Sequence, residues 1–475
     1  MTRPAAHSMV GGESFVAAGA EIPVINPFTE QPMGRATEAG AEIVDRAVRD
    51  AHRAYAAWRG IAVEERAALL ERVADLLARD EEEMAALVTS EMGMPITLSR
   101  VTQAQLPASV LRATAQVARD DFGWREEVDG ATLIRSGAGV VGAITPWNMP
   151  VHQIIAKVAA AVVAGSTVVL KASEQTPYDA TRVAELFLEA GAPEGLLNVV
   201  TGTGPVTGAA LAAHPLLTRL SFTGSVRAGR EVAALAAREL TRTALELGGK
   251  SPALLLDDVD LARAVPAALT NGLVNSGQAC NAPTRMLVPA NRLDEVLDLV
   301  REAANRFVLG DPTDEDTNQG PLVTARQQAS VLARIERAQA QGGRLVIGTG
   351  RPSERTSTGF FVDPTVIVGL EEDAEAVREE IFGPVVVLQP YADEAEAIRI
   401  ANDSDYGLSA EVWSGDDERA LAVAEMLSVG QVKINGVRTR NRPLVPFGGM
   451  RNSGYGRELG PLGIEEFTDV TAVMA

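Results

Sequence analysis

Cys280 is the only cysteine among the 475 residues, and it lies in a polar segment, Asn-Ser-Gly-Gln-Ala-Cys-Asn-Ala-Pro-Thr-Arg (275–285). A lone thiol leaves no intramolecular disulfide and no cysteine-built metal site. At the start of a loop or helix, backbone N–H groups would stabilise its thiolate, which is a strong nucleophile. The alternative is a small buried apolar residue, the commoner role of an isolated cysteine. The polar, glycine-containing surroundings weaken the alternative, and both interpretations stay open.

Two more side chains that could do chemistry follow predicted strands. Glu246, in Glu-Leu-Gly-Gly-Lys-Ser (246–251), could act as a general base, or it could be a solvated charge at a strand end. The two glycines after it predict a close approach of the backbone to another group. Asn148, in Thr-Pro-Trp-Asn-Met-Pro (145–150), could donate to a developing oxyanion. Its alternative is a turn or cap residue, although two prolines suit a rigid donor.

A third group of residues suggests a dinucleotide. Lys171 and Glu174 lie just beyond a short apolar strand, where a dinucleotide-binding sheet places the residue that contacts the adenosine ribose. A carboxylate there accepts hydrogen bonds from ribose hydroxyls and repels a 2′-phosphate, which favours NAD over NADP. The alternative is an acid in the first turn of a helix. For the pyrophosphate we prefer Phe-Thr-Gly-Ser (222–225), between a strand and a helix, over the glycine cluster 202–208.

The elements that must position these residues alternate regularly. Strands are predicted at 140–144, 167–170, 197–200, 219–222 and 242–245, with helices at 151–164, 179–190 and 226–240. This pattern predicts a doubly wound parallel sheet of Rossmann type, whose ligands lie beyond the carboxyl ends of the strands. Strands at 253–256, 286–288, 385–388, 409–413 and 431–434 predict a second α/β domain. Apolar stripes predict N-terminal helices at 44–58 and 64–92, and 124–136 is expected to form a hairpin.

Composition narrows the class of protein. The formal charge of −20, from 43 basic and 63 acidic residues, argues against nucleic acids and anionic membranes as partners. No apolar run reaches the roughly 20 residues of a membrane span, and we expect a cytoplasmic protein because no disulfide can form within the chain. The four histidines are too scattered for a metal site. His152 alone could pair with Cys280, as in a cofactor-independent cysteine hydrolase, which is one alternative function. Another is an inactive binding protein.

Taken together and in this order, seven segments resemble the aldehyde dehydrogenase superfamily. They are Thr-Pro-Trp-Asn-Met-Pro (145–150), Lys-Ala-Ser-Glu (171–174), Phe-Thr-Gly-Ser (222–225), Glu-Leu-Gly-Gly-Lys-Ser (246–251), Gly-Gln-Ala-Cys (277–280), Glu-Ile-Phe-Gly-Pro (380–384) and Pro-Phe-Gly-Gly (446–449) with Asn-Ser-Gly-Tyr-Gly-Arg-Glu (452–458). The resemblance extends from about residue 26 to the C-terminus. It implies a small-molecule aldehyde as substrate and NAD, with NADP less favoured, as cofactor.

The resemblance also implies roles for single residues. Cys280 would be the nucleophile, Glu246 the base that activates water, Asn148 the oxyanion donor together with the Cys280 N–H, and Lys157 a supporting residue. Because relatives that transfer the acyl group to coenzyme A lack the glutamate, Glu246 favours release of a free acid. The implied cofactor residues are Trp147, Lys171, Ser173, Glu174, Gly224, Ser225, Leu247, Glu380 and Phe382, and the implied substrate residues are Met149, Ala279, Asn281 and Phe447.

Domain organisation follows from the same resemblance. We expect a cofactor domain at 1–118 and 138–247, a catalytic domain at 248–448, and an oligomerisation element at 119–137 and 449–475, in a homodimer or homotetramer. Arg438, Arg440 and Arg442 precede the Pro-Phe-Gly-Gly segment. One of them could bind the carboxylate of a semialdehyde acid, and the alternative is a solvated basic loop.

Overall fold

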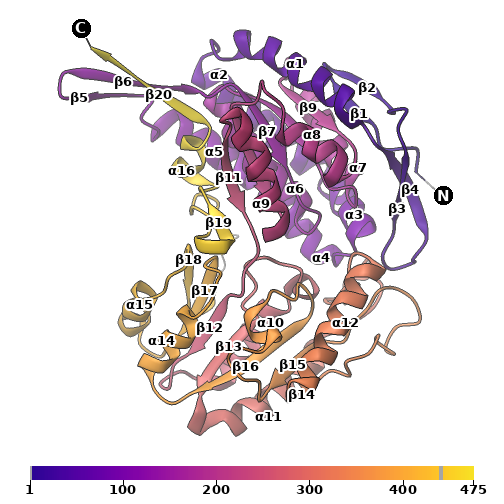
Figure 1. Ribbon diagram of the computed structural model, residues 1–475, viewed down its shortest axis with the longest axis vertical. Helices are drawn as coiled ribbons and strands as arrows, with labels where there is room; N and C mark the ends of the chain where they lie inside the picture. The colour runs from indigo at the N-terminus through magenta and orange to yellow at the C-terminus, as the bar shows by residue number, and fades with distance from the viewer. Residues whose placement is uncertain (1–2, 438–441, 475) are drawn as a thin grey trace.

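A computed structural model describes residues 3–437 and 442–474, which form two α/β bodies and a thin antiparallel arm (Figure 1). The larger sheet has eight strands in the order β19-β11-β10-β7-β8-β9-β1-β2. Its parallel centre follows the predicted strands, and antiparallel β1, β2 and β19 form its edges. The strands are β1 (Ser8–Val10), β2 (Glu13–Phe15), β7 (Val140–Ile144), β8 (Thr167–Lys171), β9 (Leu197–Val200), β10 (Arg219–Thr223), β11 (Arg242–Glu246) and β19 (Gly454–Tyr455).

The strand order reverses between β7 and β10, which lie side by side. In an open parallel sheet, the loops at such a switch point separate and leave a crevice for a ligand. The loop after β7 carries Asn148, and the loop after β10 carries Gly224 and Ser225. The doubly wound fold expected from the sequence is confirmed, and it brings two of the singled-out segments to the same crevice.

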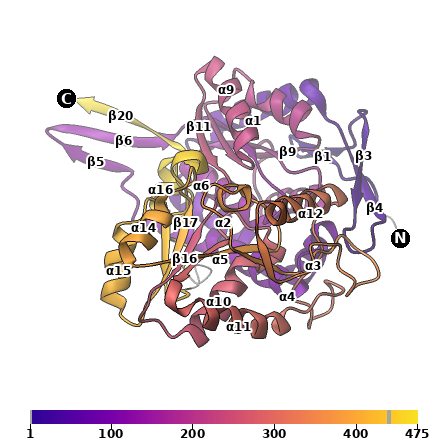
Figure 2. The same ribbon diagram turned by 60° about the horizontal axis from the view of Figure 1, so that its bottom comes forward.

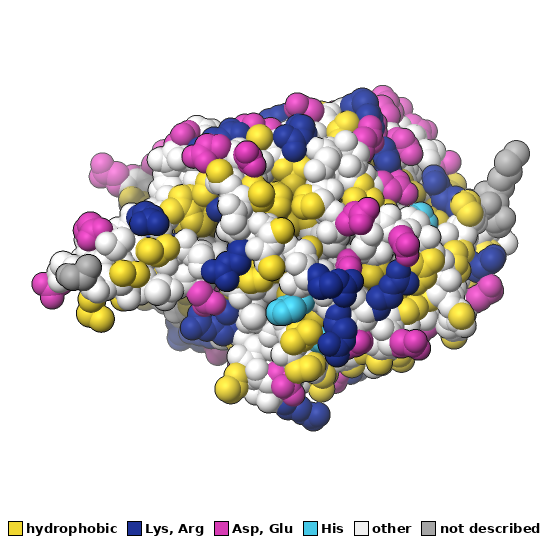
Figure 3. All heavy atoms as spheres, turned by 90° about the horizontal axis from the view of Figure 1, so that it is seen from above, with side chains coloured by type: hydrophobic (Ala, Val, Ile, Leu, Met, Phe, Trp, Pro, Cys, Tyr) yellow, Lys and Arg dark blue, Asp and Glu magenta, His cyan; other side chains and the backbone are white. Residues whose placement is uncertain are grey.

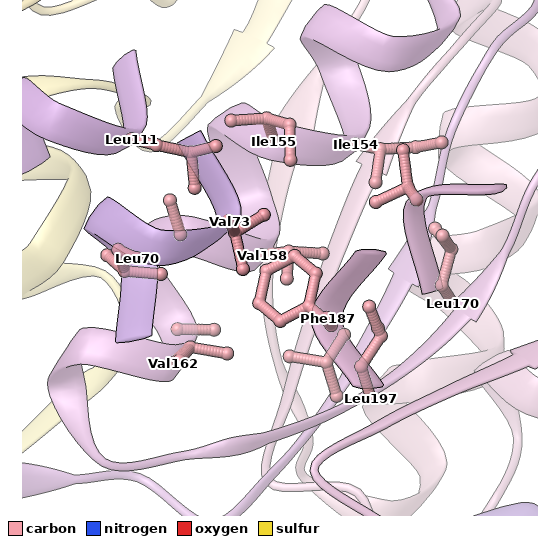
Figure 4. Packing of buried hydrophobic residues seen from close by; sticks show 14 of the residues in the cluster. Leu70, Val73, Leu111, Ile154, Ile155, Val158, Val162, Leu170, Phe187 and Leu197 are labelled. Atoms are coloured by element: carbon pink, nitrogen blue, oxygen red, sulfur yellow. The ribbon is translucent and has the colours of Figure 1, made fainter. Parts of the chain in front are cut away.

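Helices cover both faces of this sheet (Figures 1 and 2). Helix α6 begins with Pro150 at its first turn and ends at Gly165, whose φ of 96° stops the helix. Its isoleucine and valine side chains pack in one hydrophobic cluster with side chains of α2, α5 and α7 (Figure 4). The helices of this body are α1 (Gly40–Trp58), α2 (Val63–Arg79), α3 (Glu81–Met92), α4 (Ile96–Ser99), α5 (Leu106–Asp120), α6 (Pro150–Ala164), α7 (Pro177–Glu189), α8 (Ala209–Ala212) and α9 (Val226–Ala236).

The single helix predicted over 64–92 is wrong, because the chain leaves helical geometry at Asp80 with φ −96° and ψ 19°. The Asp80 carboxylate is drawn to Arg79 and to Arg182 of α7, and these ion pairs fix the break between α2 and α3. Asp80 therefore joins α2 and α3 to α7.

The smaller sheet has seven strands in the order β14-β15-β16-β13-β12-β17-β18. All five strands predicted here are present, whereas the edge strand β14 and its neighbour β15 were not predicted. The strands are β12 (Pro252–Leu255), β13 (Arg285–Pro289), β14 (Arg344–Ile347), β15 (Thr365–Val368), β16 (Val385–Tyr391), β17 (Ser409–Trp413) and β18 (Gln431–Ile434). The helices are α10 (Leu261–Gly272), α11 (Leu293–Ala303), α12 (Ala325–Ala340), α13 (Glu375–Arg378), α14 (Glu394–Asn402) and α15 (Asp417–Glu425).

The predicted hairpin and the C-terminal segment together form the arm. β5 (Arg125–Val128), β6 (Ala131–Gly137) and β20 (Thr468–Met474) make a three-stranded antiparallel sheet, and α16 (Gly460–Glu465) leads into β20. Near the N-terminus, β3 (Glu21–Ile25) and β4 (Pro32–Thr37) form a separate ribbon. Seen from above, the arm extends from the body with hydrophobic side chains among the charged ones (Figure 3). β20 keeps Val470, Val473 and Met474 exposed.

The described residues lack two kinds of feature, a membrane-spanning helix and a metal site. In residues 3–437 and 442–474 no helix has both the length and the apolar character that crossing a membrane requires. Within the same residues, no group of three or more His, Cys, Asp or Glu side chains is arranged to hold a metal ion.

Candidate active site

The loop that leads to Cys280 is held in an unusual backbone conformation. Asn275, Ser276 and Gly277 have φ values of 52°, 56° and 72°, a region that Asn and Ser rarely adopt. Asn275 compensates by donating from Nδ2 to the carbonyl oxygens of Asn148 (3.1 Å) and Gln278 (3.3 Å). The side chain of Gln278 in turn donates to the carbonyl oxygen of Asn275 over 3.1 Å. This buried network fixes the approach to Cys280 before any ligand binds.

Asn148 lies against the same loop. Its side chain is buried, and Nδ2 donates to the carbonyl oxygen of Gln278 over 3.0 Å. Since Asn275 binds the backbone of Asn148, each segment holds the other. The loop after β7 and the loop before Cys280 come from the two different bodies of the protein, so this contact is where the two halves of the site meet.

Two cavities meet at Cys280 and Asn148, which line both. The first, which we call the Phe382 cavity, has a volume of about 230 Å³ and is lined by Pro146, Trp147, Asn148, Thr223, Gly224, Ser225, Leu247, Gly248, Cys280, Gln327, Glu380 and Phe382. The second, the Phe447 cavity, has a volume of about 190 Å³ and is lined by Thr102, Leu106, Asn148, Met149, His152, Gln153, Ala279, Cys280, Asn281, Gln431, Arg442, Pro443, Val445, Phe447 and Leu459. The Cys280 thiol therefore lies at the junction of the two cavities.

The Phe382 cavity contains six of the nine residues expected to bind the cofactor: Trp147, Gly224, Ser225, Leu247, Glu380 and Phe382. The rings of Trp147 and Phe382 meet edge to face at 5.5 Å. Glu380 accepts a hydrogen bond from the Gly249 N–H over 3.2 Å, and burial raises the pKa of its carboxyl to about 7. A side chain at Gly248 would have to displace the Glu380 carboxylate from its present position.

The other three expected cofactor residues, Lys171, Ser173 and Glu174, lie outside that lining at the end of the neighbouring strand β8. Lys171 Nζ and Glu174 Oε2 form an ion pair of 3.2 Å, and Ser173 Oγ accepts from the Gln175 N–H. The residues of the rival glycine cluster bind elsewhere: Thr203 and Thr207 contact the Glu38 carboxylate. Ser225 caps α9 by accepting a hydrogen bond from the Ala228 N–H. The N–H groups of the first turn that Ser225 does not bind remain at the crevice. These N–H groups, the glycines that line the Phe382 cavity and the crevice between β7 and β10 fit an extended dinucleotide.

A buried group of charges lies behind the thiol. Glu246 is the last residue of β11 and is only 4% exposed, and neither cavity has it in its lining. In the described residues neither Glu246 oxygen has a hydrogen-bonding side-chain or backbone partner. Burial and the nearby Glu458 carboxylate raise the pKa of Glu246 well above its usual range, although Lys157 opposes them. A carboxyl with a raised pKa suits proton transfer near neutral pH.

Lys157 forms the counter-ion of this group. It projects from the apolar helix α6, is 1% exposed, and donates from Nζ to Thr223 Oγ1 over 2.7 Å and to the Glu458 carboxylate. In the sequence, Glu458 is the last residue of the segment 452–458, and we predicted no role for it. A signal was available, because a lysine predicted to lie inside an apolar helix requires a buried anion.

The state of the thiol differs from the sequence expectation. The Asn281 N–H favours the thiolate, but burial and the carboxylates of Glu246, Glu380 and Glu458 raise the pKa of Cys280 above its ordinary value. These groups oppose the thiolate that we expected the backbone N–H groups to stabilise. The proton on Cys280 Sγ is therefore held more tightly than in a free cysteine.

The Phe447 cavity contains all four residues expected to contact the substrate, Met149, Ala279, Asn281 and Phe447. Arg442 lies at its exposed side, whereas Arg438 and Arg440 fall outside the described residues. His152 lines the cavity too, but burial lowers the pKa of its imidazole to about 4. Such a weak base does not suit the Cys–His pair of a cofactor-independent hydrolase.

The model of the aldehyde dehydrogenase family matches residues 15–473. The chain belongs to the aldehyde dehydrogenase family. This aldehyde dehydrogenase is 45% identical over 456 residues to the 3-succinoylsemialdehyde-pyridine dehydrogenase of a Pseudomonas species, and the match covers 96% of this chain and 95% of that protein. The resemblance drawn from the seven segments is thereby confirmed.

Solved structures agree with that assignment. Aldehyde dehydrogenase C from Pseudomonas syringae, a cysteine-to-alanine mutant in complex with NAD+ and octanal, matches with a TM-score of 0.96 at 40% identity, over 98% of this chain and 96% of that one. Betaine aldehyde dehydrogenase from Staphylococcus aureus in complex with NAD+ matches with a TM-score of 0.94 at 32% identity, over 98% and 94% of the two chains. The aldehyde dehydrogenase fold and its two α/β bodies are therefore those of this enzyme.

Proposed function

We propose that this aldehyde dehydrogenase oxidises an aldehyde to its carboxylic acid with NAD, and that Cys280 is the nucleophile. One observation carries the proposal: Cys280 and Asn148 line both the Phe382 cavity and the Phe447 cavity. A reaction that transfers a hydride from an aldehyde to a cofactor needs both ligands next to the nucleophile that holds the aldehyde. The relatives in complex with NAD+ and with octanal support these two kinds of ligand.

In the first half of the reaction, Cys280 Sγ gives its proton to a solvent water molecule and adds to the aldehyde carbon, which gives a tetrahedral thiohemiacetal. The second N–H of the Asn148 amide and the Cys280 N–H then hold the oxyanion. Trp147, Glu380 and Phe382 would hold NAD in the Phe382 cavity, where it would supply the acceptor for the hydride that leaves this carbon as the thioester forms on Sγ.

In the second half, Glu246 takes a proton from a water molecule, whose oxygen attacks the thioester carbon. The carbon–sulfur bond breaks, the carboxylic acid leaves, and Sγ regains a proton. The raised pKa of Glu246 makes the carboxyl a base of useful strength near neutral pH. Lys157, paired with Glu458, limits how far that pKa can rise.

The test follows NADH formation by its ultraviolet absorbance with a panel of aldehydes, and repeats it with Cys280→Ala. We expect turnover with NAD in the wild type and none in the variant. Steady turnover by Cys280→Ala would refute Cys280 as the nucleophile. Absence of NADH formation with every aldehyde would refute the proposed reaction.

A second candidate is a dehydrogenase for a semialdehyde acid, in which Arg442 binds the distal carboxylate. Its support is the position of Arg442 in the lining of the Phe447 cavity. The Pseudomonas relative is named for a semialdehyde, which supports a substrate with a second functional group. If Arg442→Ala changes turnover of succinic semialdehyde and of pentanal by the same factor, the carboxylate contact does not exist.

The assembly and the compartment belong to the same proposal. Residues 1–118 and 138–247 serve as the cofactor domain, 248–448 as the catalytic domain, and 119–137 with 449–475 as the oligomerisation element of a homodimer or homotetramer. The exposed apolar residues of β20 support an interface on the arm. The pairing of β19 with β11 ties residues 454–455 to the cofactor domain as well. A cytoplasmic location suits a chain whose one thiol must stay reduced.

A further inference from the structure

The Phe447 cavity contains polar side chains that the proposed reaction does not use. Leu106, Met149, Val445, Phe447 and Leu459 give it apolar walls. His152 interrupts them. It is the one half-buried residue of α6, and the other side chains from Pro150 to Ala164 are buried. Gln153 of the same helix also lines the cavity, but its Oε1 accepts a hydrogen bond from Thr223 Oγ1 over 3.1 Å.

The imidazole of His152 has no hydrogen-bond partner in residues 3–437 and 442–474. Its Nδ1 is enclosed, and the ring takes part in none of the hydrogen bonds among the described residues. Gln103 is the nearest candidate, but its Oε1 accepts from the backbone N–H of His152 over 3.3 Å, and its Nε2 donates to Thr102 Oγ1 and Met149 Sδ. Gln103 is therefore committed elsewhere.

The enclosure of Nδ1 decides where the ring carries its proton. With a pKa lowered to about 4, the imidazole is neutral near pH 7 and carries one N–H. An enclosed N–H without an acceptor is rarer in proteins than an acceptor without a donor. The proton therefore resides on Nε2, at the ring edge away from the enclosed Nδ1, and the cavity receives a neutral donor.

Gln431, the first residue of β18, adds a second uncommitted group to the same cavity. Its Oε1 is enclosed and without a partner among the described residues, which leaves the amide N–H groups for the cavity side. Two donors in an apolar space favour a ligand with a hydrogen-bond acceptor. Because the imidazole carries no charge, a neutral acceptor is preferred: a carboxylate would lose hydration against apolar walls without gaining a buried counter-charge.

We propose that His152 is a specificity residue whose Nε2–H binds a neutral acceptor, a carbonyl oxygen or a ring nitrogen, that the aldehyde substrate carries some atoms away from its reacting carbon. Gln431 is the second donor to that group. This inference rests on the proposed function, since it assigns the Phe447 cavity to the aldehyde. The substrate class is then an oxo-aldehyde or a heterocyclic aldehyde, as opposed to a plain alkanal or a semialdehyde acid.

The test compares 4-oxopentanal with pentanal, which differ in one carbonyl group. We expect wild-type kcat/KM to be larger for 4-oxopentanal, and His152→Leu to lower the ratio of the two values roughly tenfold. His152→Asn, which keeps a donor, retains part of the ratio. His52→Leu, the same change at an exposed histidine of α1 that lines neither cavity, is the matched control. It leaves the ratio unchanged.

Equilibrium binding to the non-reacting Cys280→Ala enzyme, by calorimetry, separates this inference from the reaction itself. We expect tighter binding of 4-oxopentanal than of pentanal, and a loss of that difference in Cys280→Ala/His152→Leu. An unchanged difference in the double variant overturns the inference even if the enzyme oxidises aldehydes. A larger wild-type kcat/KM for succinic semialdehyde than for 4-oxopentanal also overturns it, in favour of Arg442. If no aldehyde is oxidised, the proposed reaction fails and the binding measurement still decides the role of His152.

Discussion

The side-chain amide of Asn148 donates to the carbonyl oxygen of Gln278 over 3.0 Å, two residues before Cys280. This bond uses one of the two N–H groups of the amide and fixes the direction of the other. A donor fixed in advance stabilises a developing oxyanion without reorganisation, which is the largest single contribution in many enzymes. The backbone loop before the thiol thus orients the side chain that would act on the thiol adduct.

Asn148→Ala should lower kcat by roughly 10²–10³, the loss seen when one oxyanion donor is removed. KM should change less, because the donor acts on the transition state more than on the bound aldehyde. Steady-state kinetics with a fixed aldehyde measure both constants. Asn291→Ala, an exposed amide, is the control, and a loss in Asn148→Ala no larger than in that control would contradict the role.

The raised pKa of Glu246 predicts an acid limb in the pH profile of turnover. The carboxylate is the active form, so turnover should fall as the pH drops through a midpoint above the ordinary value of 4.5. Glu246→Gln cannot activate water, and we expect it to release about one equivalent of NADH per site and then to stall at the acyl-enzyme. Rapid-mixing absorbance resolves the burst. Steady turnover by Glu246→Gln with the same acid limb would show that another group activates the water.

Glu174 should set the choice between NAD and NADP. Its carboxylate forms the 3.2 Å ion pair with Lys171 at the end of β8 and would repel a 2′-phosphate. Glu174→Gln removes the negative charge and leaves Lys171 free to attract the phosphate. We expect the ratio of kcat/KM for NADP to that for NAD to rise roughly tenfold or more, which one opposite charge can supply. Glu194→Gln, an exposed acid, is the control, and equal ratios in both variants would remove Glu174 from cofactor selection.

The buried pair of Lys157 and Glu458 should be costly to break from one side. Lys157→Met leaves Glu458 and Glu246 without their counter-ion, and such a change typically costs about 3–5 kcal/mol of unfolding free energy. Adding Glu458→Gln should recover part of that loss. Arg227→Met breaks an exposed ion pair with Glu231 and should cost only about 0.3–0.5 kcal/mol. Urea titrations compare the three, and equal losses in Lys157→Met and Arg227→Met would mean that the buried pair does not stabilise the fold.

The sequence predicted the parallel strands and the residues at their carboxyl ends well, because both follow from short-range pattern. Asn148 after β7, Glu246 at the end of β11 and Ser225 after β10 lie where alternation of strand and helix puts them. The break at Asp80 was missed because its cause is Arg182, in a helix about a hundred residues later. The raised pKa of Cys280 was not predicted, because burial depends on what the rest of the chain packs around the thiol.

The separation of Lys157 and Glu458 along the chain has a consequence for biosynthesis. The two residues are 301 positions apart, and a ribosome adding about 5–20 residues per second needs roughly 15–60 s to reach Glu458 after Lys157 has emerged. For that time the apolar helix α6 contains a cation without its partner, so the centre of the first body cannot close around it at low cost. Synthesis of Glu458 is therefore the event that lets the N-terminal half settle around Lys157.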